Sequence, residues 1–293
     1  MSLNEGNFNR LKQAIEEHDF AHAEDYLLNT AKQTVIGFKA GRDSYVEIGN
    51  SRIGGEPDLP EGWEWPADSD GMLMSFVLQL NLAGTKDAEN RLPQDGVLFF
   101  FVGDYGLETE HRVLYASAEE MKGAARRQAP GELPFEADFG PYRPYRVEAK
   151  GSLDLPGYSY VDEDAIEDEN HGWEEYEELG FALKDGEPSA AVKMFGYAEG
   201  QHGDDEYMAA LELFGCDSTY DPKEAIERLT KALGGDRERA EREVADIVML
   251  AEIDSDDDIG FMWGDAGVLH YFMRREDLLK GSFDRTYCSY YSS

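Results

Sequence analysis

The chain has 293 residues, and its 41% hydrophobic and 12% aromatic shares suffice for a folded core although 30% of the residues are charged. Its 62 acidic residues outnumber the 27 basic ones, so the formal net charge is −35 at pH 7. Such a charge repels nucleic acid and anionic lipid, so we expect neither as a partner. Two cysteines and the lack of a membrane-length apolar run (roughly 18 residues) favour a cytoplasmic protein.

The chain is expected to begin with a helical segment and to continue in strands. Apolar residues at helical spacing predict helix within residues 1–33. Residues 34–38 and 44–48 are β-branched or aromatic runs that flank Gly41, a pattern typical of a hairpin. Strands buried on both faces are predicted at residues 72–80 and 96–102, and further strands at 114–116 and 145–155. Residues 34–160 are therefore expected to form a first β-rich half.

An acidic linker is expected over residues 161–186, because ten of the 17 residues between Asp162 and Glu178 are acidic. A second β-rich half is expected over residues 187–293. Two amphipathic helices, opened by Asp221 and Asp236, form a predicted helical insertion at 221–243. The strand-like runs of this half lie at residues 247–253, 267–273 and 283–291.

Three pairs of short segments resemble each other and occur in the same order. They are 52–55 (RIGG) with 193–196 (KMFG), 78–81 (LQLN) with 251–254 (AEID), and 96–101 (GVLFFF) with 267–272 (GVLHYF). The offsets are 141, 173 and 171 residues, and the change between them coincides with the helical insertion. This order predicts an internal duplication. We expect a mainly β or α+β fold whose two halves pack about a pseudo-twofold axis as one interlocked domain, with peripheral helices.

Residues 51–60 (SRIGGEPDLP) resemble the entry motif of the YwqG-like family, a domain of unknown function (DUF1963). Similar motifs follow in order at 78–81, 92–100 (LPQDGVLFF), 253–258 (IDSDDD) and 262–268 (MWGDAGV). The resemblance covers roughly residues 34–290 and implies a mainly β, internally duplicated fold, but no activity. Two features depart from the family pattern: residues 195–199 lack its usual proline, and His270 stands where an apolar or aromatic residue is commoner.

An acidic loop carries the candidate metal ligands. Asp254, Asp256, Asp258 and Asp265 match positions 1, 3, 5 and 12 of a calcium-binding loop in residue type. Ile259 occupies the position that requires glycine, so the loop is not an EF-hand. A looser Ca²⁺ or Mg²⁺ site is one interpretation. The favoured alternative is that these aspartates cap turns by accepting backbone N–H bonds.

Arg52 is the expected counter-charge of this loop. If the halves pack about a pseudo-twofold axis, Arg52 reaches Asp254 or Asp265, in a structural ion pair or a ligand site. Gly54 and Gly55 permit close backbone approach or a positive φ.

The remaining candidate positions lie in the other family-like motifs. Gln79 belongs to the motif at the end of a strand. Trp263, beside Gly264, is either a core anchor or a stacking platform at a cleft, and core packing is favoured.

The histidines do not assemble a metal site from the sequence. His18 and His22 are four residues apart, which suits zinc on a helix, but no third ligand is evident. His270 lies in an apolar strand and is expected to be a satisfied core residue.

Two functional hypotheses remain open. The first is a non-enzymatic binding or interaction protein that holds a protein or small-molecule ligand in a groove between its halves, without a cofactor. It is motivated by the absence of a nucleophile–base motif from the sequence. The alternative is a divalent-metal-dependent hydrolase or calcium-binding protein that uses the loop 254–265 with Ca²⁺ or Mg²⁺.

Overall fold

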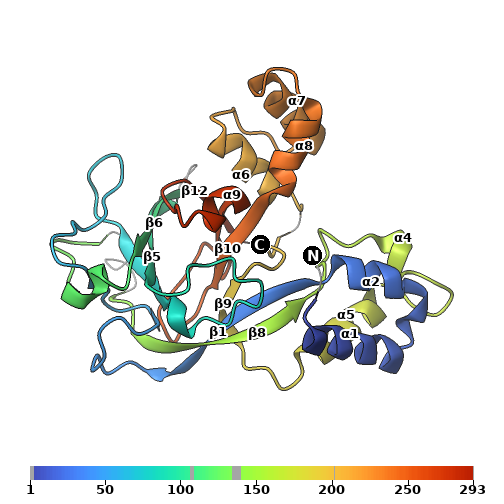
Figure 1. The fold of residues 1–293 in the computed structure, drawn as a ribbon, viewed down its shortest axis with the longest axis horizontal. Coiled ribbons are helices and arrows are strands. Elements are labelled where there is room, and N and C mark those ends of the chain that lie inside the picture. Colours follow the sequence, from blue (N-terminus) through green and yellow to red (C-terminus); the bar gives the residue numbers. More distant parts are fainter. Residues whose placement is uncertain (1–2, 106–108, 134–139, 201, 293) are drawn as a thin grey trace.

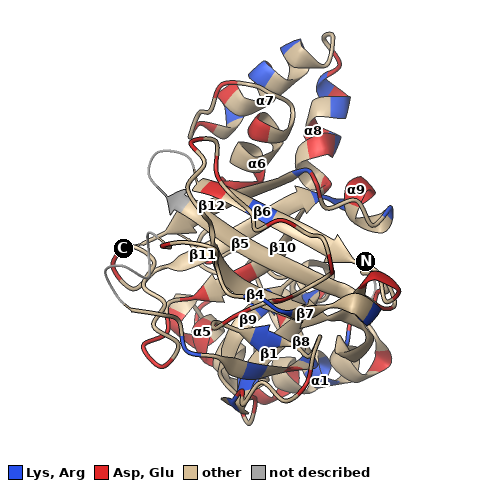
Figure 2. Cartoon of the chain, turned by 90° about the vertical axis from the view of Figure 1, so that its left-hand side faces the viewer, with Lys and Arg blue, Asp and Glu red and all other residues tan. Residues whose placement is uncertain are grey.

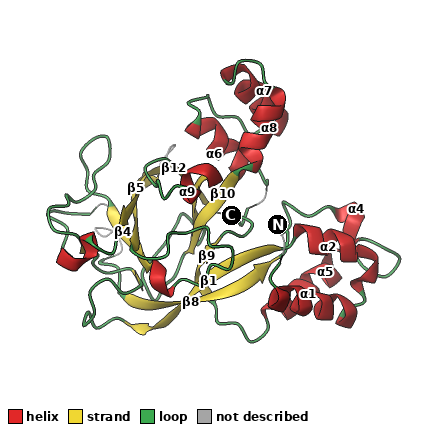
Figure 3. Cartoon of the chain, in the orientation of Figure 1, coloured by secondary structure: helices red, strands yellow, loops and turns green. Residues whose placement is uncertain are grey.

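The fold is organised by one antiparallel sheet of ten strands (Figures 1 and 3). The computed structural model describes residues 3–105, 109–133, 140–200 and 202–292. In sheet order the strands are β12 (Thr286–Tyr291), β11 (Val268–Arg274), β10 (Ile247–Asp254), β9 (Ala190–Met194), β1 (Lys32–Arg42), β8 (Tyr145–Asp154), β2 (Arg52–Ile53), β4 (Ser75–Asn81), β5 (Val97–Tyr105) and β6 (Thr109–Ala116). Short strands β3 (Asp58–Leu59) and β7 (Ala125–Arg126) pair separately. The expected mainly β class with peripheral helices is confirmed.

The helices gather in two groups at different places around the sheet (Figure 3). One group contains α1 (Glu5–Glu17), η1 (Phe20–Ala23), α2 (Glu24–Thr30), α4 (Glu163–Ile166) and α5 (Trp173–Lys184). The other contains α6 (Asp205–Leu213), α7 (Pro222–Ala232) and α8 (Arg237–Ala245). The described residues also include the short helices η2 (Leu82–Gly84), η3 (Glu120–Gly123) and α9 (Arg275–Leu279). The N-terminal helical segment predicted from the sequence is thus confirmed.

The local sequence explains where α7 and α8 begin. The Asp221 side chain accepts a 2.8 Å hydrogen bond from the Lys223 amide, and Pro222 occupies the first turn, where its missing N–H costs nothing. Asp236 likewise accepts from the Arg239 amide at 2.9 Å. Both helices of the predicted insertion are present, and each begins directly after its capping aspartate.

Strand β1 lies at the centre of the sheet and pairs on both sides. Its partners are β8, with Val35 opposite Gly151, and β9, with Val35 opposite Met194. The hairpin predicted over residues 34–48 is therefore wrong, because β1 continues to Arg42 and residues 44–48 form no strand. The partners of β1 come from more than 100 residues away, which a local turn signal does not reveal.

The sheet curls until its two outermost strands, β6 and β12, meet. His111 Nε2 lies 3.0 Å from Thr286 Oγ1 across this contact. Nearby, the Tyr271 hydroxyl of β11 donates to the Phe101 carbonyl of β5 at 3.3 Å. The curl encloses a core to which all the long strands contribute, and Phe100 and Tyr271 meet in it edge to face, with ring centroids 5.1 Å apart.

The segments that resemble each other in sequence occupy corresponding places in the sheet. Arg52 pairs with Gln79 in β2–β4, and Lys193 pairs with Glu252 in β9–β10. The β4–β5 ladder shifts register between residues 76 and 78, and the β10–β11 ladder shifts between residues 249 and 251. The duplication itself and the domain boundaries drawn from it stay predictions.

The acidic surplus is mixed with basic side chains on the surface. Figure 2 shows Lys and Arg interspersed with Asp and Glu on α7 and α8. On α8, for example, Arg237 Nε lies 2.9 Å from Glu241 Oε1 one turn away. In the described part of the chain, no helix has both the length and the apolar character that crossing a membrane requires.

We predict that the core between β5 and β11 carries much of the stability. Replacing fully buried Phe100 by Ala should lower the free energy of unfolding by about 3–5 kcal/mol, because it leaves a cavity beside Tyr271. Phe181→Ala is the control, since Phe181 is 65% exposed and should change stability by less than about 0.5 kcal/mol. Urea unfolding curves of both variants measure the difference, and equal effects would contradict this description of the core.

Candidate functional site

A buried ionic network surrounds Arg52, whose side chain is fully buried. Its Nε lies 2.6 Å from Asp43 Oδ2, and its Nη2 lies 3.0 Å from Asp58 Oδ2. Nη1 donates to the Glu56 carbonyl at 2.7 Å. The expected pairing of Arg52 with Asp254 or Asp265 is therefore wrong: its partners lie in the same half of the chain.

Gln79 and Arg126 complete this network around Asp58. The Gln79 amide donates to Asp58 Oδ2 at 2.9 Å, and its oxygen accepts from the Asp58 backbone amide at 2.8 Å. Arg126 Nη2 lies 2.7 Å from Asp58 Oδ1. We call Asp43, Arg52, Asp58, Gln79 and Arg126 the arginine cluster. Its two guanidinium groups balance its two carboxylates, so the cluster is electrically neutral and internally paired.

Gly54 and Gly55, which follow Arg52, allow the chain to pass close to Tyr45 and to the backbone of residues 143–144. Both have positive φ, +67° and +72°. A Cβ on Gly54 would lie 2.6 Å from the Arg143 carbonyl oxygen, and one on Gly55 would lie 2.3 Å from the Tyr45 hydroxyl. Any side chain would displace these neighbours, so glycine is required at both positions.

Trp263 is a core residue in the structure. Its side chain is fully buried, with its ring centroid 4.9 Å from that of Phe261 and 6.4 Å from that of Tyr142. The adjacent Gly264 has φ +59°, and a Cβ there would lie 2.6 Å from Ser292 Oγ. Both residues hold the loop after β10 against the core.

The structure separates the four aspartates of the acidic loop. Asp256 and Asp258 both pair with Lys39 of β1, at 2.6 and 2.9 Å. Asp256 also accepts from the Ile259 amide at 3.1 Å, as a turn cap does. Asp265 is exposed. Among the described residues, the only one of the four that joins a compact group of potential ligands is Asp254.

Asp254 lies with Glu199 and Glu252, and we call these three residues the carboxylate cluster. One carboxylate oxygen from each lies within 4.8 Å of the other two. Glu252 is buried, Asp254 is half-buried, and Glu199 is exposed, so the cluster opens to solvent on the Glu199 side. Sequence analysis singled out Asp254 but missed Glu252, two residues earlier in β10, and Glu199, which follows β9.

Glu252 is held in place by three donors. Lys193 Nζ lies 2.9 Å from Oε1, and His270 Nε2 and the Glu199 backbone amide lie 3.1 and 2.7 Å from Oε2. His270 is fully buried, and its Nδ1 has no hydrogen-bond partner in the structure. No hydrogen bond to the carboxylates of Asp254 or Glu199 is found among the described residues. The carboxylates of Asp254 and Glu199, which accept no hydrogen bond from the described residues, therefore lie beside the fixed carboxylate of Glu252.

The electrostatics of the carboxylate cluster differ from residue to residue. The pKa of Asp254 is raised to about 7, first by burial and then by the negative charges of Glu252 and Glu199, against the opposing effect of Lys193 and His270. The pKa of Glu252 falls to about 2, because Lys193 and His270 outweigh the effect of burial. Near neutral pH, Asp254 is thus the group at which a proton and a bound cation compete.

The two clusters occupy corresponding positions but carry different charges. By the sequence offsets, Glu199 corresponds to Asp58, Glu252 to Gln79, and Asp254 to Asn81. The Asp58 amide donates to the Gln79 side chain just as the Glu199 amide donates to the Glu252 side chain. Two neutral amides of the first half are therefore carboxylates in the second half. The second half accordingly has a local excess of negative charge.

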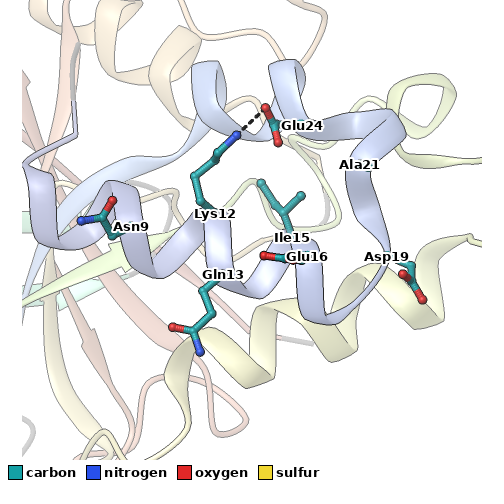
Figure 4. A pocket seen from close by; sticks show the side chains of 8 residues that line it. All are labelled: Asn9, Lys12, Gln13, Ile15, Glu16, Asp19, Ala21 and Glu24. Atoms are coloured by element: carbon teal, nitrogen blue, oxygen red, sulfur yellow. Dashed lines mark ion pairs between the residues drawn. The ribbon is translucent and has the colours of Figure 1, made fainter.

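A surface hollow lies elsewhere, on the N-terminal helices (Figure 4). It is lined by Asn9, Lys12, Gln13, Ile15, Glu16, Asp19, Ala21 and Glu24. Lys12 Nζ and Glu24 Oε1 are paired across it at 2.6 Å. None of these residues belongs to the arginine cluster or the carboxylate cluster.

The chain belongs to the family described as a domain of unknown function (DUF1963), whose model matches residues 51–291. Both clusters lie largely within the matched residues, with only Asp43 before them. Comparison with curated proteins gave no match.

We predict that Arg52 is essential for stability. Arg52→Ala should lower the free energy of unfolding by about 3–5 kcal/mol, because Asp43 and Asp58 lose a buried counter-charge. The control is Arg146→Ala: Arg146 faces Arg52 across β2–β8, but its side chain is 50% exposed and should matter little. Chemical denaturation compares the two, and a small effect for Arg52→Ala would refute the network described here.

We predict that Asp254 makes stability fall as pH rises. Its folded-state pKa of about 7 lies above an unfolded value of about 3.9, so the native state retains a proton that the unfolded state releases. Without divalent cations, Asp254→Asn should therefore exceed the wild type in free energy of unfolding at pH 8 by roughly 2–4 kcal/mol, because a shift of about three pKa units corresponds to at most about 4 kcal/mol. The difference should shrink to about 0.5 kcal/mol near pH 4, where Asp254 is protonated in the folded state and close to half protonated in the unfolded state.

Denaturation at several pH values between 4 and 8 measures this effect. Asp265→Asn provides the control, because Asp265 is exposed. If the difference in free energy of unfolding between Asp254→Asn and the wild type does not change with pH, Asp254 does not have the raised pKa.

Proposed function

We propose that this chain is a binding protein whose ligand is a divalent cation, Ca²⁺ or Mg²⁺, held by Glu199, Glu252 and Asp254. Carboxylate oxygens are the ligands that these hard cations prefer, and irregular loops beside strands supply them in many geometries. The site lies where β10 ends and the segment after β9 passes, with the exposed Glu199 on its solvent side.

The observation that carries the proposal is the charge imbalance around Asp254. The three carboxylates of the cluster lie close together, and the positive charge that contacts them is that of Lys193. Lys193 pairs with Glu252 at 2.9 Å but also lies 3.5 Å from Asp154, so its charge is shared with a carboxylate outside the cluster. A bound divalent cation relieves the repulsion that raises the pKa of Asp254. The arginine cluster needs no such ion, because Arg52 and Arg126 already neutralise Asp43 and Asp58.

The proposal retains Asp254 from the acidic loop and replaces Asp256, Asp258 and Asp265 by Glu199 and Glu252. The contact of Asp256 and Asp258 with Lys39 supports this choice, because their charge is already compensated. A groove between the two halves, a YwqG-like identity and a cytoplasmic location stay predictions from the sequence.

We predict that Ca²⁺ or Mg²⁺ stabilises the folded chain through Asp254. At pH 7.5, cation at a hundredfold excess over its dissociation constant should add about 2.7 kcal/mol to the free energy of unfolding. Asp254→Asn should abolish this gain, whereas Asp256→Asn, the matched change in the neighbouring loop, should retain it. Melting curves with chelator and with each cation measure the gain.

Two results would contradict the proposal. If neither cation shifts the melting temperature of the wild type, the carboxylate cluster binds no divalent ion. If Asp256→Asn abolishes the shift and Asp254→Asn preserves it, the ion lies in the loop.

A further inference from the structure

Two histidines and an aspartate converge where the N-terminal helices meet the acidic segment. His22 lies in η1, and Asp168 and His171 lie in the connection between α4 and α5. His22 Nδ1 is 3.3 Å from Asp168 Oδ2, and His171 Nδ1 is 2.8 Å from Asp168 Oδ1. One ligand atom from each residue lies within 4.8 Å of the other two. Three potential metal ligands thus lie close together, although 146 positions in the sequence separate His22 from Asp168.

The hydrogen bonds of His22 fix which ring nitrogen faces Asp168. His22 Nε2 lies 2.9 Å from the Ile166 carbonyl oxygen, which only accepts, so Nε2 carries a proton. In the neutral ring the lone pair of Nδ1 is then directed at a carboxylate oxygen. Two acceptors at 3.3 Å repel each other unless a proton or a metal ion lies between them. The Ile166 carbonyl is also the kind of partner that orients a metal-binding imidazole.

We propose that His22 Nδ1, the Asp168 carboxylate and His171 Nδ1 bind a transition-metal ion of the Zn²⁺ class. Zn²⁺ takes imidazole nitrogen and carboxylate oxygen at about 2.0–2.2 Å, so its ligand atoms lie about 3.3 Å apart in a tetrahedron. The two imidazole nitrogens lie 2.8 and 3.3 Å from different oxygens of Asp168, so modest side-chain movements bring one oxygen and both nitrogens to this spacing. The Nδ1 proton of His171, which now bonds to Asp168, must leave Nδ1 on binding: a neutral ring takes up a proton at Nε2 as Nδ1 loses one, and an imidazolium ring releases the Nδ1 proton to solvent. Nitrogen ligands distinguish this site from the carboxylate cluster, which suits harder cations.

The surroundings of the three residues suit a partly open metal site. The side chains of His22, Asp168 and His171 are 26%, 33% and 14% exposed, so a water molecule can occupy the fourth position. The Phe20 ring packs against both imidazoles, with centroids 5.4 and 4.8 Å away, and restricts their orientation. The ion would tie η1 to the segment that leads into α5. Of the three residues, His22 precedes the range matched by the family model, whereas Asp168 and His171 lie within it.

Isothermal titration of the full chain with Zn²⁺ at pH 7.5 tests the proposal, with a weak competing chelator to suppress adventitious binding. We expect one ion per chain. His171→Gln and Asp168→Asn should each weaken the affinity by at least about tenfold. Both residues are partly exposed, and far-UV circular dichroism without metal verifies that the variants fold.

His18→Gln is the matched control. Although His18 is four residues before His22, it ends α1, and Asp19 has a left-handed φ of 58°, so the two histidines do not share a helix face. The control should bind Zn²⁺ like the wild type. The absence of saturable binding, or equal affinity in wild type and His171→Gln, would overturn the proposal. Binding that survives in His171→Gln but is lost in Asp254→Asn would instead assign the ion to the carboxylate cluster and also overturn it.

Discussion

The pairing of β1 with both β8 and β9 is the constraint on which the rest of the structure depends. Because β1 forms ladders on both edges, strands from the two parts of the chain share one sheet. Arg52 on β2 and Lys193 on β9 thereby come to flank the central β1–β8 pair. The curl that brings β6 to β12 then buries the inner face of the sheet. Each of the two clusters is thus fixed by long-range strand pairing.

The arginine cluster and the carboxylate cluster lie at matching positions of the sheet, but their charges are compensated in different ways. Around Arg52, charges and amides pair within the protein, and this satisfied network serves folding. Around Asp254, the corresponding amides are carboxylates, and the protein supplies too few donors for them. A local excess of buried negative charge costs stability, and a bound cation offsets that cost.

The positions of individual helices and strands were more predictable from the sequence than the strands and side chains with which they pair. Apolar runs predicted β5 and β11, because strands buried on both faces leave a continuous hydrophobic signal. Helix α7 was evident from its capping Asp221. The hairpin after residue 34 failed because pairing in this sheet is set by contacts between distant segments. Asp254 was recognised within an acidic run, but Lys39 of β1 takes Asp256 and Asp258, and no local pattern reveals that pairing.

The sequence did hold a signal for Glu199 and Glu252, since the offsets that align the resembling segments place them at the positions of Asp58 and Gln79.

The central claim is that Asp254 exchanges a proton for a divalent cation. Its most direct test is ¹³C NMR titration of the Asp254 carboxyl group with and without saturating Ca²⁺ or Mg²⁺. We predict an apparent pKa near 7 without the cation and a value several units lower with it. An ordinary pKa near 3.9, or one that neither cation changes, would contradict the account.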